Sequence, residues 1–392
     1  MTEPNATAVV VCSHFPFPVS SGGRKRTVRL LEAMERAGAR PHIITHDEIV
    51  EGQPEARSRG WSYEIVPLPR GTVRTRLRQH VRSEASRRSD AIVQRLRALA
   101  PQIAFAQFEE VASIQYVHAA PLGLPTVVSL YNVDSQVARD AVRAGSNGGV
   151  AWRERYRAKR MELTERRAVR RADAVLAVSD YDRLRFQEWG ARRSMLVANG
   201  VDARLFALPE RVPSDERVLF FGHFGWAPNL AGAQRYLEET WPSVAAARPN
   251  AQLRIAGPRS DEKLREAAAA HERVEVLGFV DDLVTELAAA RVVVAPLWVG
   301  GGTRIKVLEA LAAARPVVGT PVGVERIGFE HDRHGLIADT PAGLSKATVR
   351  VLADDDAAAR YAIAGRRLAE DYRWEATTAP AEELYRELLT RR

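Results

Sequence analysis

Short apolar runs alternate with amphipathic stretches along most of this 392-residue chain. The run from Ala8 to Cys12 is followed by an amphipathic stretch from Arg24 to Ala37 and by a second apolar run from His42 to Thr45. This order is typical of a β-loop-α-β unit, which builds parallel sheets with helices on both faces. The pattern therefore predicts an α/β protein with doubly wound, Rossmann-like parallel sheets.

The alternation occurs in two series, separated by a segment without periodicity. That segment, Ala207 to Ser214, contains two prolines and has the composition of a linker. We predict a domain at residues 1–203, a second at 204–375, and a final amphipathic helix in 376–392 that packs back on the first domain. Ligands of open α/β sheets bind at the carboxyl ends of the strands, so we expect a cleft between two facing domains.

Further elements can be assigned within both series. In the first, we expect strands at 103–105, 126–130 and 173–178 and a long charged helix at 151–171. In the second, we expect strands at 218–221, 252–256, 274–277, 292–295 and 317–319 and helices at 231–240 and 307–314.

The composition is that of a globular protein, with 46% hydrophobic and 27% charged residues. No apolar run reaches the roughly 18 residues that a membrane span needs, and the first residues do not resemble a signal peptide. The single cysteine, Cys12, excludes an internal disulfide and is expected to be a small buried residue. We therefore predict a cytoplasmic protein, and the high Arg and Ala content favours a bacterial source.

Positive charge is concentrated in the first half of the chain. The first 200 residues hold 32 Lys and Arg against 21 Asp and Glu, a net charge of +11, whereas the remainder is net −3. This asymmetry indicates an anionic partner for the first half, although solvated Arg-rich helices are an equal alternative. Residues 70–88 contain seven arginines and could contact an anionic membrane at its inner face. Nucleic acid is not expected, because aromatic residues are not interleaved with the basic ones.

The segment from Val299 to Ala310 carries the most chemical information. It reads Val-Gly-Gly-Gly-Thr-Arg-Ile-Lys-Val-Leu-Glu-Ala, between a predicted strand and a predicted helix. Glycines in such a turn let backbone N–H groups approach a ligand, and a helix start favours anions. Arg304 and Lys306 add positive charge, and Glu309 could accept hydrogen bonds from hydroxyl groups. The segment suits a nucleoside diphosphate; the alternative is an ordinary connection with solvated basic residues.

A second glycine loop, at residues 20–26, follows the first predicted strand. It contains Gly22 and Gly23, followed by three basic residues at the start of a predicted helix. The loop fits neither the G-x-G-x-x-G dinucleotide motif nor the P-loop motif, which disfavours those two classes. Two glycine loops flanked by cations, one in each predicted domain, are more specific than either alone.

These motifs, taken in order, resemble those of a retaining glycosyltransferase of family 4 (glycosyl transferases group 1), which has the GT-B fold. The resemblance covers nearly the whole chain. Its motifs lie at Phe15–Gly23, Arg171–Ser179, Asn199–Phe206, Phe221–Asn229, Leu277–Asp282, Gly300–Glu309 and Arg315–Val318.

The resemblance implies roles for individual positions. Glu309 matches the second acid of the family's E-x7-E motif, which holds the donor ribose, and Arg304 and Lys306 would bind the departing diphosphate. Together with Asn132 these are the expected catalytic residues. The residues expected to bind the donor are Gly22, Gly23, His223, Gly278, Phe279, Val280, Gly301, Gly302, Thr303, Arg304, Lys306 and Glu309.

The chain departs from the family pattern at two positions. Gly301 stands where the first acid of E-x7-E would be, so backbone N–H groups would have to replace that carboxylate. Tyr131 stands where the family often has a His. Asn132 or Asp134 could take over part of that role, and His14, at the end of the first strand, could contact a substrate or be a buried structural histidine. We expect the acceptor to contact His14, Tyr131, Asn132 and Asp134.

No metal site or cofactor is expected. Two Asp-x-Asp pairs occur, at Asp180–Asp182 and Asp354–Asp356, but both are at predicted helix starts, where acids stabilise the helix dipole. The predicted function is transfer of a sugar from a nucleotide sugar, with UDP or GDP as the expected carrier, to a glycan, lipid or small natural product. The alternatives are a nucleotide-sugar epimerase of the same fold and a non-catalytic sugar-nucleotide-binding protein. The oligomeric state cannot be assigned from the sequence.

Overall fold

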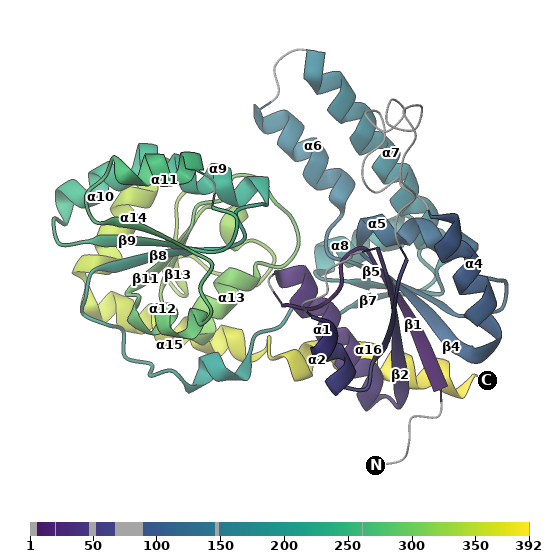
Figure 1. Cartoon of the computed structure of the whole chain (residues 1–392). Helices are drawn as coiled ribbons and strands as arrows, with labels where there is room; N and C mark the ends of the chain where they lie inside the picture. Colours follow the sequence, from purple (N-terminus) through teal and green to yellow (C-terminus); the bar gives the residue numbers. More distant parts are fainter. Residues whose placement is uncertain are drawn as a thin grey trace. The chain divides into compact units, whose positions relative to one another are not determined.

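The computed structural model describes residues 6–19, 21–46, 52–66, 89–145, 149–260 and 262–391 (Figure 1). The chain divides into two compact units. Unit 1 comprises Met1–Ala198 and Thr378–Arg392, and unit 2 comprises Asn199–Thr377. The chain passes from unit 1 to unit 2 at residues 198/199, whereas the sequence predicted a boundary at 203/204, and the last helix contributes to both units.

Unit 1 contains a seven-stranded parallel sheet in the order β3-β2-β1-β4-β5-β6-β7. Its strands are β1 (Ala6–Cys12), β2 (Ala39–Thr45), β3 (Ser62–Ile65), β4 (Ile103–Glu109), β5 (Thr126–Leu130), β6 (Ala174–Ala177) and β7 (Ser194–Leu196). Its helices are α1 (Gly22–Arg36), α2 (Gln53–Ser58), α4 (Asp90–Leu99), α5 (Glu110–Ser113), α6 (Asp134–Gly145), α7 (Gly149–Arg171) and α8 (Asp180–Glu188), with α16 (Trp374–Thr390) returning from unit 2.

β1 shows why this sheet has helices on both faces. Successive side chains of a strand point to opposite faces. Val9 and Val11 belong to a core that includes residues of α4, α7 and α8, whereas Val10 and Cys12 belong to a core formed with α1 and α16. Cys12 is buried, as predicted.

Unit 2 contains a six-stranded parallel sheet in the order β10-β9-β8-β11-β12-β13. Its strands are β8 (Arg217–Phe221), β9 (Gln252–Ala256), β10 (Val274–Gly278), β11 (Val292–Ala295), β12 (Val317–Gly319) and β13 (Gly335–Ile337). Its helices are α9 (Ala227–Arg235), α10 (Trp241–Ala247), α11 (Glu262–Ala269), α12 (Leu283–Ala289), α13 (Ile305–Ala312), α14 (Pro341–Ala353) and α15 (Asp355–Glu370).

The second sheet also has two cores. Val218 and Phe220 of β8 pack with residues of α9, α10 and α14, whereas Leu219 and Phe221 pack with α12 and α13. The predicted fold of two Rossmann-like parallel sheets is therefore confirmed within the described residues. The helix predicted at 231–240 starts earlier, at α9, and continues through a π-helical turn (Tyr236–Thr240) into α10.

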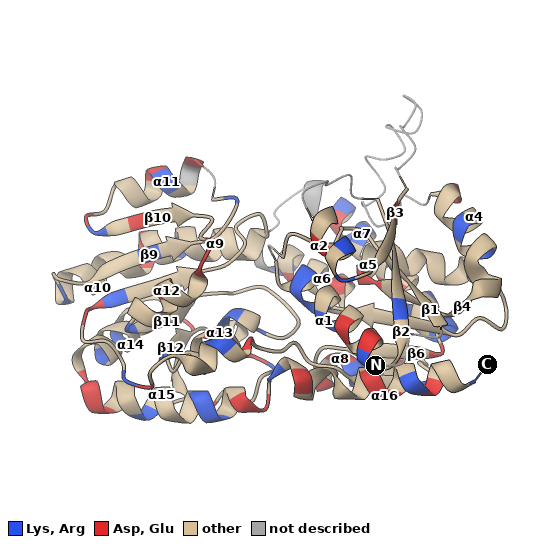
Figure 2. Ribbon diagram, turned by 60° about the horizontal axis from the view of Figure 1, so that its bottom comes forward, with Lys and Arg blue, Asp and Glu red and all other residues tan. Residues whose placement is uncertain are grey.

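The C-terminal helix completes unit 1. Tyr385 of α16 stacks on Phe105 of β4 with ring centroids 5.3 Å apart, and its hydroxyl donates to the side-chain oxygen of Gln107 at 2.7 Å. Most of the charged residues of α16 are acidic (Figure 2), and Glu382 pairs with Arg36 of α1 at 2.8 Å. The helix is thus fixed to unit 1 by packing and by ion pairs.

Candidate functional site

Glycines occupy the carboxyl ends of neighbouring strands in unit 2. Gly257, directly after β9, has φ +148°, and a Cβ atom there would lie 1.8 Å from the carbonyl oxygen of Gly222, which follows β8. The Gly257 N–H donates to the carbonyl of Gly278 at 2.7 Å. Three strand ends therefore approach so closely that position 257 accepts only glycine, and backbone groups line this edge of the sheet.

Helix α13 starts at the same edge, after the glycine loop that was predicted to bind phosphate. Gly300 and Gly302 have positive φ values of +159° and +70°, and Arg304, which precedes the helix, forms no side-chain capping hydrogen bond. A helix start has a partial positive charge that favours an anion; the N–H groups of Ile305 and Val307 also donate to the carbonyls of Thr303 and Arg304. The local geometry therefore agrees with the chemistry expected of this loop.

The guanidinium of Arg304 is buried against the backbone. Its Nε donates to the carbonyl of Val322 at 2.8 Å, its Nη1 to the carbonyl of Gly301 at 2.9 Å, and its Nη2 pairs with Glu325 at 2.9 Å. These contacts connect the glycine loop to the segment after β12. A direct contact of Arg304 with phosphate stays a prediction, and it would share the guanidinium with these partners.

Lys306 is the cation of α13 that reaches the end of β8. Its Nζ donates to Oδ1 of Asn229 at 2.6 Å and lies 4.8 Å from the ring centre of Phe220. A Cβ atom on Gly222 would lie 2.9 Å from this Nζ, so the ammonium adjoins the glycine-lined edge. Burial, reinforced by the charge of Arg304, lowers the pKa of Lys306 to about 7.

Asn229 was not predicted as a site residue, although it lies in one of the motifs that resemble the family, Phe221–Asn229. It is buried near the start of α9, and its Nδ2 donates to the carbonyl of His223 at 2.9 Å. With Lys306 on its oxygen, Asn229 joins the loop after β8 to α13. The His223 side chain packs beside Gly225, where a Cβ would lie 2.7 Å from its ring.

The other donor-binding residues predicted in unit 2 lie on the same edge. Glu309 is one turn into α13 and Thr303 just precedes the helix, and both are buried. Gly278 ends β10 with φ +71°, and Phe279 after it is 59% exposed. An aromatic ring that remains exposed beside a strand end is available to stack on a flat ligand group.

In unit 1 the predicted glycine loop begins α1. Ser21 caps the helix by accepting from the N–H of Arg24 at 3.3 Å. A Cβ atom on Gly23 would lie 2.9 Å from the ring of Tyr131, so this tyrosine covers the loop. Its hydroxyl donates to Glu109 at 2.9 Å and lies 2.7 Å from Oγ1 of Thr27.

Below Tyr131 lies a buried polar network that was missed in the sequence. Glu109 ends β4 and is fully buried, which raises its pKa, while the Arg26 charge and hydrogen bonds from Gln107 and Tyr131 partly counteract that shift. Arg26 is buried too, and its Nη1 donates to the carbonyl of Val197 at 2.6 Å. The sequence does indicate that Arg26 is buried, because Arg26, Leu30 and Met34 are spaced at i, i+4 and i+8 and therefore share the apolar face of α1.

The predicted acceptor-binding residues lie at the carboxyl ends of β1 and β5. His14 is largely exposed and lies 3.7 Å from the Glu110 carboxylate. Asn132 forms a side-chain hydrogen bond with Asp134, whose pKa is raised to about 7 by burial and by the charge of Glu110. Ser135 donates its N–H to Glu165 of α7 at 3.2 Å, and burial raises the pKa of Glu165 to about 8. Three carboxyl groups therefore surround the start of α6.

The two Asp-x-Asp pairs begin helices, as predicted. Ser179 caps α8 and donates its hydroxyl to Asp182 at 2.6 Å, and Asp354 caps α15 through the N–H of Ala357 at 2.8 Å. Among the described residues, no group of three or more His, Cys, Asp or Glu side chains is placed to hold a metal ion. No helix in these ranges is both long and apolar enough to cross a bilayer. The arginine-rich stretch at 70–88 lies outside the described residues.

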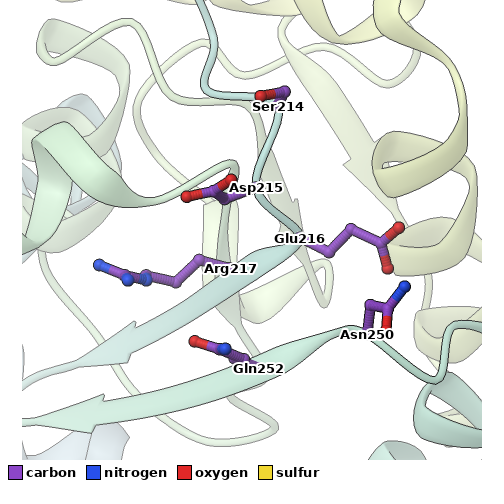
Figure 3. A pocket seen from close by; sticks show the side chains of 6 residues that line it. All are labelled: Ser214, Asp215, Glu216, Arg217, Asn250 and Gln252. Carbon is purple, nitrogen blue, oxygen red and sulfur yellow. The ribbon is translucent and has the colours of Figure 1, made fainter.

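A polar pocket of unit 2 lies at the other end of the sheet. Ser214, Asp215, Glu216, Arg217, Asn250 and Gln252 line it (Figure 3). Arg217 and Gln252 are the first residues of β8 and β9, whereas the glycine loops follow the last residues of their strands. The labelled side chains point in different directions instead of converging (Figure 3), so we do not assign the pocket a ligand.

The glycine loops and the two parallel sheets agree with the families that match the chain. Residues 20–205 match the family described as "Glycosyltransferase Family 4", and residues 215–354 match the family described as "Glycosyl transferases group 1". The chain therefore belongs to the family 4 glycosyltransferases, with the GT-B fold.

A curated relative agrees with the family, and two solved structures agree with the fold. The chain is 30% identical to the phosphatidyl-myo-inositol mannosyltransferase of Mycolicibacterium smegmatis over 226 residues, which are 54% of this chain and 56% of that protein. The match thus spans little more than half of that relative. Sucrose-phosphate synthase from Thermosynechococcus elongatus has a TM-score of 0.73 at 18% identity, covering 99% of this chain and all of that one. Anabaena HepE in complex with UDP and glucose has a TM-score of 0.69 at 16% identity, covering 97% and 99% of the two chains. The mycobacterial relatives agree with the predicted bacterial source.

Proposed function

We propose that this glycosyltransferase moves a sugar from a nucleoside diphosphate to an acceptor hydroxyl with retention of the anomeric configuration and without a metal ion. The observation that carries the proposal is the position of Lys306. Its ammonium adjoins Gly222 at the glycine-lined strand ends, close to the uncapped start of α13. Backbone N–H groups, a helix start and a cation together form a site for a diphosphate.

The chemistry follows from charge development. As the bond between the anomeric carbon and the diphosphate oxygen breaks, the diphosphate becomes more negative and the sugar becomes oxocarbenium-like. Lys306 and the N–H groups after Gly300 stabilise the leaving group, and Arg304 holds the loop in place through Gly301. The acceptor oxygen forms the new bond to the anomeric carbon, and its proton passes to the departing diphosphate. This route requires neither a protein base nor a metal.

The donor base would stack near Phe279, whose ring is exposed beside Gly278. UDP and GDP are the proposed carriers. The presence of UDP in the HepE complex supports a uridine carrier, and the mannosyltransferase relatives leave a different carrier open. Glu309 would bind the donor ribose.

We propose that the acceptor is a hydroxyl-bearing glycan, lipid or small natural product held by unit 1. Asn132 and Asp134 are better placed than Tyr131 to contact it, because the Tyr131 hydroxyl is already engaged by Glu109 and Thr27. A lipid acceptor would agree with the relatives' name and with a cytoplasmic enzyme at the inner face of an anionic membrane.

Thermal shift measurements with UDP, GDP, TDP and their common sugars, with and without Mg²⁺, test the donor site. We expect one nucleotide to raise the melting temperature without metal, and Lys306→Ala to abolish that shift. Lys346→Ala, which removes an exposed lysine of α14, should leave it unchanged. The absence of any shift in the wild type would refute the diphosphate site.

Transfer is then tested with the nucleotide sugar that binds. Lys306→Ala and Arg304→Ala should each lose about 2–4 kcal/mol of transition-state stabilisation. Wild-type turnover by Lys306→Ala would refute its role. Gly301 in place of an acid favours the non-catalytic alternative, which donor binding without transfer to any acceptor would support. Conversion of the donor sugar without an acceptor would instead identify an epimerase.

A further inference from the structure

One face of α7 carries aromatic, aliphatic and basic residues and no acid. Trp152, Tyr156 and Leu163 are 62%, 47% and 44% exposed. At 100° per residue these three positions fall within a 40° arc of the helix. Large apolar side chains that share an exposed stripe are unusual on a surface that faces only water.

Basic residues border this stripe on both sides. Arg155 and Lys159 lie on one side of it, and Arg153, Arg160 and Arg167 on the other, and all five are exposed. Two of them also lie over the aromatic rings, with Arg153 5.8 Å from the Trp152 ring centre and Arg160 5.8 Å from that of Tyr156. The exposed face of α7 is defined here as these eight residues.

None of the acids of α7 lies within this face. Glu162 and Glu165 are buried, and Glu162 pairs with Arg139 of α6 at 2.6 Å. Glu154 is half-buried, about 160° round the helix from Trp152, and pairs with Arg157 at 2.8 Å. Glu162 also lies 3.7 Å from the ammonium of Lys159, so this one cation of the exposed face has an acidic neighbour at the edge of the face.

Helices α6 and α7 lie side by side and extend beyond the sheet of unit 1 (Figure 1). An extended hairpin with tryptophan and tyrosine between cations has the composition of a helix that lies in a membrane interface. Anionic headgroups complement the five cations, and the aromatic rings suit the boundary between headgroups and acyl chains.

We infer that the exposed face of α7 docks this protein on the surface of an anionic lipid bilayer. This inference rests on the peripheral membrane location proposed above and identifies the surface that would contact the membrane. It does not depend on the transfer reaction. The helix lies on the membrane and does not span it.

Sedimentation of the full chain with vesicles tests this inference. We expect binding to vesicles of phosphatidylcholine with 30% phosphatidylglycerol, little binding to phosphatidylcholine alone, and weakening in higher salt. Arg155→Gln with Arg160→Gln should lower the affinity by roughly fivefold per charge, and Trp152→Ser with Tyr156→Ser by at least about fivefold.

Matched controls separate this face from general properties of the chain. Arg40→Gln with Arg97→Gln removes two exposed cations of unit 1 elsewhere, and Leu122→Ser removes a residue that is 93% exposed; each should change vesicle binding by less than about twofold. The nucleotide-induced thermal shift should persist in all these variants. Vesicle binding without any nucleotide effect would refute the proposed function and leave this inference intact.

Three results would overturn the inference. The first is a wild type that does not bind anionic vesicles. The second is that the α7 variants bind vesicles as well as the wild type does. In that case, loss of binding on neutralising Arg74, Arg76 and Arg78 would assign docking to the basic stretch at residues 70–88. The third is a dimer, seen by light scattering, that Trp152→Ser with Tyr156→Ser dissociates, which would assign the face to a second copy of the chain.

Discussion

The side-chain amide of Asn229 connects two segments of the candidate donor site, since its oxygen lies 2.6 Å from Nζ of Lys306 and its nitrogen donates to the carbonyl of His223. The loop after β8 and helix α13 are thereby held at a fixed distance. A cation that is positioned before the ligand arrives requires little rearrangement when charge develops.

The protonation of Lys306 should make donor binding depend on pH. With its pKa lowered to about 7, the side chain is neutral in much of the free protein above that pH. The diphosphate binds the charged form, so the Kd for the donor should rise up to tenfold per pH unit from about pH 7 to 9. Titration calorimetry with the nucleotide sugar measures this, because its diphosphate does not titrate there. For Lys306→Arg, the Kd for the donor should be nearly independent of pH. A wild-type Kd that is equally independent of pH would contradict the role of Lys306 in binding the diphosphate.

Close backbone packing makes Gly257 intolerant of any side chain. Gly257→Ala places a Cβ on the carbonyl of Gly222 at a positive φ, and we expect a loss of about 3 kcal/mol or more in the free energy of unfolding. Gly38 also has a positive φ, +96°, but has open space around its Cα. Gly38→Ala should therefore cost about 1 kcal/mol. Chemical denaturation compares the two, and equal losses would show that contact with Gly222 is not the cause.

The hydroxyl of Tyr131 should stabilise unit 1 through Glu109. Tyr131→Phe removes a donor from a buried carboxylate, which should cost about 1–3 kcal/mol. The Tyr63 hydroxyl donates to the neutral side chain of Gln53 at 2.9 Å in a half-buried setting, so Tyr63→Phe should cost about 1 kcal/mol or less. Urea unfolding of both variants is the measurement. A smaller loss for Tyr131→Phe than for Tyr63→Phe would contradict a stabilising hydrogen bond from Tyr131 to the buried Glu109.

The carboxyl groups of Asp134 and Glu165 should weaken unit 1 as the pH rises. Their pKa values are raised to about 7 and 8 in the fold, so the folded state binds protons that the unfolded chain releases near pH 4. The stability is complete below about pH 4 and is lost as the pH rises through 7 and 8. Melting temperatures from pH 5 to 8.5 should fall in the wild type.

Substitution of Asp134 and Glu165 distinguishes their contribution to the pH dependence of stability from that of other acids. The double substitution Asp134→Asn with Glu165→Gln should flatten the pH dependence of the melting temperature, whereas Asp90→Asn, at the exposed start of α4, should leave it unchanged. If the double variant keeps the wild-type dependence of melting temperature on pH, that dependence arises from other groups.

For Thr126–Leu130, Gln252–Ala256 and Val292–Ala295, predicted and observed bounds agree. Thr126–Leu130 and Val292–Ala295 are buried at every position, and short runs rich in apolar residues are visible without knowledge of their neighbours. β3, β7 and β13 were missed. Each has three or four residues and lies at an edge of its sheet, so pairing with the adjacent strand determines them more than composition does.

The candidate site was predictable where glycines and charges lie close together in sequence. Gly302 and Lys306 occur within one loop and helix start, so the sequence shows their relation. The contact of Arg26 with Val197 joins residues that are far apart in the sequence. The contact of Arg304 with Val322 joins residues that are separated by strand β12. A charged residue in a sequence gives no sign of being buried, and only the fold reveals that its partner is a backbone carbonyl.

The return of the chain to unit 1 through α16 has a consequence for synthesis on the ribosome. Unit 2 is one continuous segment, so it can fold as soon as it has emerged. Unit 1 has to wait for Tyr385 to reach Phe105 and Gln107. The part of the protein that is translated first is therefore the last to be completed, and until then the surface that α16 covers is open to chaperones.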